Sequence, residues 1–111
     1  MFGRQVIMQL KADSAAELAR IIKLEIIPLQ LKQRGFRDET TFIAPERSKA
    51  ITSSFWDTKE DAEAYGRTGY LQVLAALSEV IEGTPTVETF AIASSTFHGA
   101  VAQRVVAQKI Y

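Results

Sequence analysis

Cysteine is absent from this 111-residue chain, histidine occurs once, and the formal net charge is zero. Without cysteine the chain has no disulfide, no thiolate zinc site and no thiol nucleophile. A single histidine cannot build a multi-histidine metal centre, so we expect no metal. The balance of 13 basic and 13 acidic residues gives no electrostatic reason to expect a nucleic acid or an anionic membrane as partner.

Long apolar runs are also missing. No segment approaches the roughly 20 residues that span a bilayer, and the first residues are too short and too polar a stretch for a signal peptide. These features predict a cytoplasmic protein. A hydrophobic content of 47% with 23% charged residues indicates a folded chain. Its length suits one domain, residues 1–111, at a size where dimerisation would add useful stability.

Alternating apolar residues and turn signals predict strands at residues 4–11, 36–44, 49–56 and 86–95. A capping box, Ser14 with Glu17, begins a first helix that extends to about residue 34 and breaks near Pro28. A second helix begins after Thr58, weakens around residues 66–69, resumes through about residue 81 and is ended by residues 83–85. For the C-terminal extension, residues 97–111, a short helix and a further strand both remain open.

The resulting order, β-α-β-β-α-β, predicts an α+β ferredoxin-like fold, a four-stranded antiparallel sheet with both helices on one face. The other sheet face carries little charge, so we expect two sheets to pack together in a homodimer. The first helix is apolar on two sides, which implies that a partner subunit or the C-terminal tail covers the second. One side has Leu18, Ile21, Ile22, Ile26 and Leu29, and the other has Leu24, Ile27 and Leu31.

Three segments carry a resemblance to a known family. They are Pro28 with residues 35–39 (GFRDE), the corner at residues 55–65 (FWDTKEDAEAY), and residues 83–85 (GTP). Over roughly residues 4–96 the chain resembles the antibiotic biosynthesis monooxygenase-like branch of the dimeric α/β-barrel superfamily. The resemblance implies a homodimer with a closed barrel and a pocket between helices and sheet in each subunit. Members include cofactor-free oxygenases of polycyclic phenols and haem-degrading enzymes.

The resemblance also narrows the chemistry. Haem-degrading members need an aromatic residue, which Tyr65 matches, but their histidine and asparagine positions fall near Ala75 and Ile7. Alanine cannot bind iron, so we expect neither haem degradation nor a cofactor. The tryptophan of the quinone-forming members matches Trp56. Their other polar residues do not map clearly, and the nearest polar groups are Thr52 and Ser54.

Each candidate residue has a functional and a structural interpretation. Trp56 could stack on an aromatic substrate or hold the strand-to-helix corner. Tyr65 and Tyr70 could hydrogen-bond a phenolic oxygen, or lie in the core with polar tips. His98 could act as a general base, or be a surface residue. The charged residues 37–39 are interpreted as a solvated sheet edge.

Two functions follow from these residues. The first is a homodimeric protein that binds a small aromatic or phenolic ligand, acting as a cofactor-independent monooxygenase with Tyr65 and His98 as catalytic residues. The second is a non-enzymatic dimeric binding or structural module. An enclosed space of less than about 300 Å³ beside Trp56 would contradict the first.

Overall fold

A computed structural model describes residues 1–96 of the chain. The predictions for residues 97–111, including the role of His98, lie outside the described residues. The elements are β1 (Phe2–Leu10), α1 (Ala15–Ile21), η1 (Ile22–Ile26), α2 (Ile27–Leu31), β2 (Phe36–Ala44), η2 (Pro45–Arg47), β3 (Lys49–Trp56), α3 (Lys59–Arg67), α4 (Gly69–Leu77) and β4 (Ile81–Ala91).

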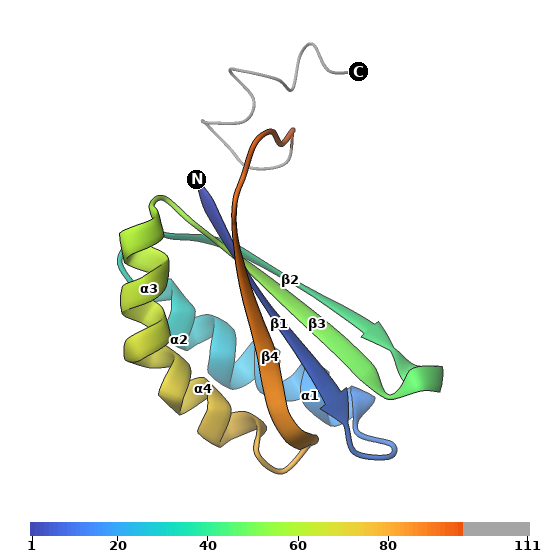
Figure 1. Ribbon diagram of the computed structural model, residues 1–111. Coiled ribbons are helices and arrows are strands. Elements are labelled where there is room, and N and C mark those ends of the chain that lie inside the picture. The colour runs from blue at the N-terminus through green and yellow to red at the C-terminus, as the bar shows by residue number, and fades with distance from the viewer. Residues whose placement is uncertain (97–111) are drawn as a thin grey trace.

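The four strands form one antiparallel sheet in the order β2-β3-β1-β4, and the helices lie on one of its faces (Figure 1). The α+β ferredoxin-like prediction is therefore confirmed. None of the helices within residues 1–96 is long and apolar enough to cross a bilayer.

The first helical stretch is not one continuous α-helix. A π-helical turn, η1, separates α1 from α2, and Pro28 lies at the start of α2. Proline has no N–H for the helical ladder, which explains the break predicted near this position. The stretch closes at Gly35, whose φ of 79° is a left-handed conformation that favours glycine.

The two predicted helix caps have different outcomes. Thr58 caps α3 as expected, because its hydroxyl accepts the Asp61 N–H at 3.0 Å. The capping box at the first helix is wrong. The Ser14 hydroxyl makes no cap bond and donates instead to the Ala12 carbonyl, and Glu17 pairs with Arg20. The Ser14 backbone is not in the extended conformation that orients a capping oxygen toward the helix.

The fourth strand begins earlier than predicted. Helix α4 ends at Leu77, and Ile81 is already the first residue of β4. Residues 83–85 are therefore inside a strand and do not end a helix. The sheet accommodates them by a register shift, since Ile7 pairs with Thr86 while Gln9 pairs with Glu82. Proline is tolerated there because β4 is an edge strand.

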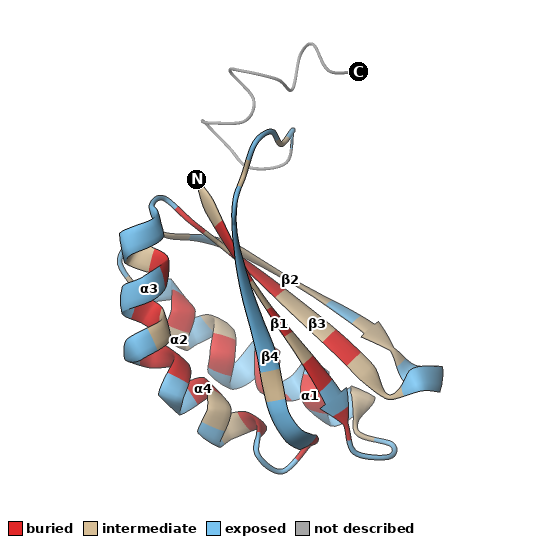
Figure 2. Ribbon diagram, viewed as in Figure 1, coloured by how far each residue is buried: buried red, intermediate tan, exposed pale blue. Residues whose placement is uncertain are grey.

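The core lies between the helices and β1 and β3, as the burial colours of Figure 2 show, whereas β4 is mostly exposed. The opposite sheet face carries the exposed Phe42 and Phe90, which are 58% and 48% accessible. Pairing places Phe42 beside Ile51 and Phe90 beside Gly3 on that face. On the first helix, the second apolar side also stays uncovered in the described chain, with Leu24 and Leu31 exposed.

Candidate functional site

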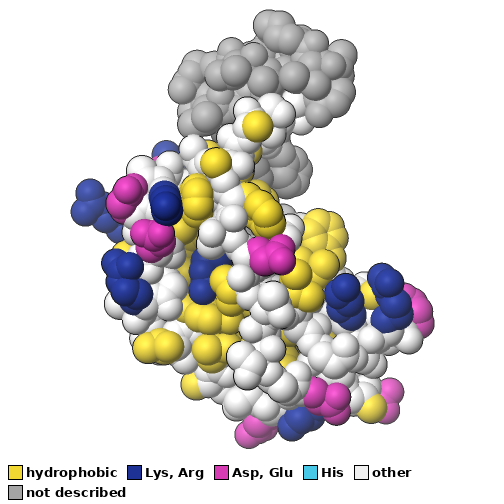
Figure 3. All heavy atoms as spheres, in the orientation of Figure 1, with side chains coloured by type: hydrophobic (Ala, Val, Ile, Leu, Met, Phe, Trp, Pro, Cys, Tyr) yellow, Lys and Arg dark blue, Asp and Glu magenta, His cyan; other side chains and the backbone are white. Residues whose placement is uncertain are grey.

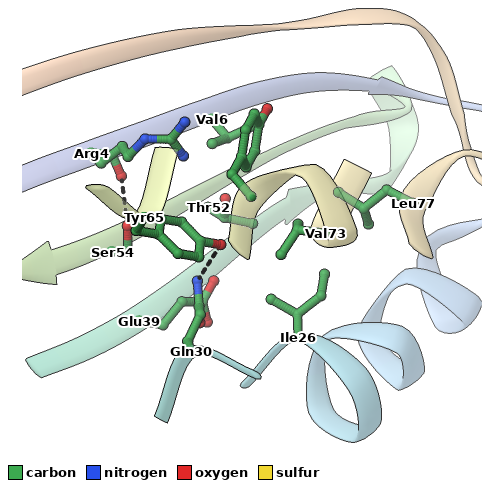
Figure 4. A pocket seen from close by; sticks show the side chains of 11 residues that line it. Arg4, Val6, Ile26, Gln30, Glu39, Thr52, Ser54, Tyr65, Val73 and Leu77 are labelled. Atoms are coloured by element: carbon green, nitrogen blue, oxygen red, sulfur yellow. Dashed lines mark hydrogen bonds between the residues drawn. The ribbon is translucent and has the colours of Figure 1, made fainter. Parts of the chain in front are cut away.

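A polar cleft lies where the helices meet the sheet, and its walls come from seven elements (Figure 4). Its volume is only about 10 Å³, which is room for one water. A pocket for a drug-sized ligand needs at least ~300 Å³, so the space falls below the threshold set for the small-molecule function. The lining residues are Arg4, Val6, Ile26, Gln30, Glu39, Thr52, Ser54, Tyr65, Tyr70, Val73 and Leu77.

Tyr65 lies at the centre of this cleft. It is 3% exposed, and its hydroxyl accepts a hydrogen bond from Gln30 Nε2 at 3.3 Å. Burial raises the pKa of the Tyr65 hydroxyl, although the Gln30 bond and the Arg4 charge oppose the shift. Burial also raises the pKa of Tyr70, whose ring centroid is 6.2 Å from that of Tyr65. Both phenols are therefore neutral hydrogen-bonding groups at neutral pH.

Trp56 stands behind Tyr65, away from the cleft wall. It is fully buried, with its ring centroid 4.8 Å from Tyr65 and 5.4 Å from Phe36. Its indole Nε1 donates to the Ser54 hydroxyl at 2.9 Å. This placement favours the corner role, because both the ring and its one donor are already occupied inside the protein.

Arg4 brings a permanent positive charge into the cleft. It projects from β1 and is 6% exposed. Its guanidinium carbon lies 4.1 Å from the Tyr70 ring centroid and 5.4 Å from that of Tyr65. Burial lowers the pKa of Arg4, while the two tyrosines raise it. Contacts of this kind with aromatic faces offset part of the cost of burying a cation.

The interpretation of residues 37–39 as a solvated sheet edge is wrong for Glu39. Arg37 is exposed and pairs with Asp57, as an edge residue would. Glu39 instead lines the cleft, and its carboxylate accepts the Thr41 hydroxyl at 2.8 Å. Burial raises the pKa of Glu39. The alternation of β2 turns it inward, because Glu39 pairs with Ser54 of β3, which is buried.

Of the remaining predicted site residues, Thr52 and Ser54 lie in the cleft, and His98 lies outside the described residues. Thr52 and Ser54 both line the cleft from β3, and Ser54 also donates to the Arg4 carbonyl at 3.4 Å. The structure thus brings Tyr65, Tyr70, Thr52 and Ser54 together.

Three cleft residues were not among the sequence candidates. Arg4 lies on the inward side of β1 with Val6 and Met8. A charged residue among the apolar positions of a strand could have indicated that Arg4 is buried. Glu39 had the same kind of signal on β2. Nothing in the sequence indicated Gln30. Regular α-helical spacing would place it at the side of the helix, but after the π-helical turn it lies in the core and is 4% exposed.

No protein-family model and no curated protein sequence matches the chain. Solved structures match its fold. A monooxygenase from Streptomyces coelicolor, in complex with the ligand nanaomycin D, has a TM-score of 0.72 at 13% identity, covering 85% of this chain and 88% of that one. SnoaB, a cofactor-independent oxygenase from Streptomyces nogalater, has a TM-score of 0.67 at 14% identity, covering 85% and 94%.

A putative antibiotic biosynthesis monooxygenase from Bordetella bronchiseptica has a TM-score of 0.70 at 12% identity, covering 83% of this chain and 96% of that one. Identities at this level establish the fold and leave the reaction open. The protein therefore has the ferredoxin-like α+β fold of antibiotic biosynthesis monooxygenase structures, in agreement with the resemblance in its sequence.

Proposed function

We propose that the protein is a cytoplasmic homodimer that binds a small aromatic ligand in the polar cleft and oxidises it as a cofactor-independent monooxygenase. The gathering of buried polar groups at one point of the core carries this proposal. Arg4, Gln30 and Tyr65 would each be replaceable by an apolar residue if the region served packing alone, because buried polar groups are costly. Solved oxygenases with the same fold support it.

The proposed reaction converts a ring methylene of a polycyclic phenol to a carbonyl. A base removes a proton, the resulting carbanion adds O₂, and a hydroperoxide forms. Loss of water then leaves the carbonyl, so one oxygen atom enters the product and the other leaves as water. The substrate supplies all the electrons. The protein contributes by orienting the ligand and by excluding water from its anion.

Tyr65 is proposed to donate a hydrogen bond to the phenolic oxygen. The Tyr65 hydroxyl accepts a hydrogen bond from Gln30 Nε2, and no residue within 1–96 accepts the Tyr65 proton, so this proton is available to a ligand. Tyr70, Thr52 and Ser54 line the cleft around the ligand. His98 stays the base proposed from the sequence. Glu39 is a second candidate, because burial raises the pKa of its carboxyl toward the range of a useful base.

The closed cleft means that a ligand must displace side chains when it binds. Beside the cleft is an open groove of about 280 Å³ between η1, α2 and α4. Ile26 and Val73 line both the groove and the cleft, so their side chains form the wall between the two spaces. Movement of this wall would join the cleft to the groove and enlarge the space open to a ligand.

Oxygen consumption tests the enzymatic proposal. A tricyclic hydroxyanthrone added to the protein should consume O₂ faster than the same compound in buffer, with no added cofactor. Tyr65→Phe keeps the ring against Trp56 and removes the hydroxyl, so the rate should fall about ten-fold, the loss of one good hydrogen bond in the transition state. Equal uptake with and without protein would contradict the proposal.

The homodimer is proposed to form through the uncovered sheet face. Phe42 and Phe90 are the large exposed side chains on that face. Phe42→Asp should convert the dimer to a monomer in light scattering, because it places a charge in an apolar interface. Leu71→Asp is the matched control, since Leu71 is 61% exposed on α4 and lies on the helical side. A wild-type mass equal to one chain would contradict the dimer.

A second function, a non-enzymatic dimeric module, is favoured by the small cleft volume. In such a module the core would be filled and would need no space for a ligand. The stacking of Arg4 on Tyr70 would then serve only to stabilise the fold. This function predicts a dimer with neither ligand binding nor oxygen consumption. Ligand binding and oxygen uptake therefore separate the two functions, whereas both functions predict a dimeric mass.

A further inference from the structure

The charge of Arg4 has no anionic partner in the described structure. The ion pairs formed within residues 1–96 join other residues, and none includes Arg4. Glu39 lines the same cleft, but no ion pair joins its carboxylate to Arg4 within residues 1–96. A buried and unpaired cation is costly, and the tyrosine rings recover only part of the cost.

The guanidinium of Arg4 packs against an aromatic ring and against α3. Its carbon lies 4.1 Å from the Tyr70 ring centroid, and a Cβ added to Gly66 would lie 3.4 Å from Arg4 Nη2. Stacking occupies the flat face of a guanidinium and leaves the fork of N–H donors at its edge free to bind a carboxylate. Figure 3 shows a basic side chain among hydrophobic ones between β4 and helices α3 and α4.

A second unmatched group lies in the same cleft. Gln30 is 4% exposed, and its Oε1 is buried with no hydrogen-bond partner among the described residues. Its Nε2 is committed to the Tyr65 hydroxyl. The cleft thus offers an unpaired cation from the sheet and an unpaired acceptor from α2, on opposite walls (Figure 4). Buried polar groups without partners are rare, and two in one cleft indicate a ligand that completes them.

We propose that Arg4 anchors the ligand and that the ligand is an aromatic carboxylate. The carboxylate binds the free edge of the guanidinium, and the ring lies between Tyr65 and the apolar wall formed by Val6, Ile26 and Val73. A hydrogen-bond donor on the far side of the ring would satisfy Gln30 Oε1. This inference rests on the proposed ligand-binding function and specifies its ligand class.

Calorimetric titration with 2-naphthoate and 2-naphthamide tests it, since the two have the same shape and differ in charge. The wild type should bind the carboxylate at least about ten-fold more tightly, the worth of one charge-assisted hydrogen bond. Arg4→Gln should remove this preference, and Arg4→Lys should retain part of it. Arg67→Gln is the control, because it changes the net charge equally at an exposed position of α3.

The outcomes separate the two proposals. Equal wild-type affinities for both compounds overturn the anchoring role and leave ligand binding intact, and this comparison holds even if a variant does not fold. A preference that persists in Arg4→Gln also overturns the role of Arg4. If neither compound binds at millimolar concentration, both the ligand class and the ligand-binding function fall.

Discussion

Replacing Trp56 separates its role in the corner from a role in binding. The indole is fully buried, so Trp56→Ala should lower the free energy of unfolding by about 3–5 kcal/mol. A domain of 111 residues has a total stability of roughly 5–15 kcal/mol, so this single change would remove a large part of it. Trp56→Phe keeps a ring against Tyr65 but loses the bond to Ser54, and about 1–2 kcal/mol should be lost.

Urea unfolding followed by far-ultraviolet circular dichroism measures both values. The protein concentration must be fixed, because a dimer gains stability by mass action. Leu71→Ala, at an exposed position, is the control and should change stability by less than about 0.5 kcal/mol.

A double-mutant cycle tests the hydrogen bond itself. Ser54→Ala in the wild type leaves the indole N–H buried without an acceptor, a loss of about 1–3 kcal/mol. The same change in Trp56→Phe should cost less, because no donor remains. A Trp56→Ala loss below about 1.5 kcal/mol, or equal Ser54 costs in both backgrounds, would refute the corner role.

Three further comparisons test other parts of the structure. Thr58→Ala removes the oxygen that caps α3 and should cost about 1 kcal/mol in urea unfolding, whereas Ser14→Ala, which removes no cap bond, should stay within about 0.5 kcal/mol. Gly35→Ala should cost more than Gly83→Ala: both have positive φ, but only at Gly35 would the new Cβ collide with an aspartate of α3. Because the pKa of Glu39 is raised in the folded state, its contribution to stability is present below the ordinary carboxyl value of 4.5 and is lost as the pH rises through the raised pKa. Glu39→Gln should therefore raise the melting temperature at neutral pH relative to the wild type and leave it little changed at acidic pH; an unchanged difference across that range would contradict the burial of this carboxyl.

The strand pattern and the helix caps carried most of the fold information. Alternation located β2 and β3 with the bounds found in the structure, because each has one face against the core. The start of β4 was misplaced since Gly83 and Pro85 normally end elements, and only the position of β4 at the sheet edge allows them inside a strand.

The site was less accessible to sequence reasoning. The corner motif found Tyr65, and helical spacing found Tyr70. Gln30 was missed for a geometric reason: a count of about 100° per residue holds only while the helix stays α, and the π turn resets the count for every later residue. Arg4 was missed because charged residues are usually exposed, although its place on the same side of β1 as Val6 and Met8 was a signal of burial.

The shifted register in β4 has a consequence for how the protein behaves when concentrated. An exposed strand edge is a template for indefinite growth into fibres, because its free N–H and C=O groups bind the next chain. Pro85 removes one of those donors, and the extra residues opposite Ile7 to Gln9 interrupt the ladder that an added strand would need. Strand addition at this edge of the sheet is therefore disfavoured.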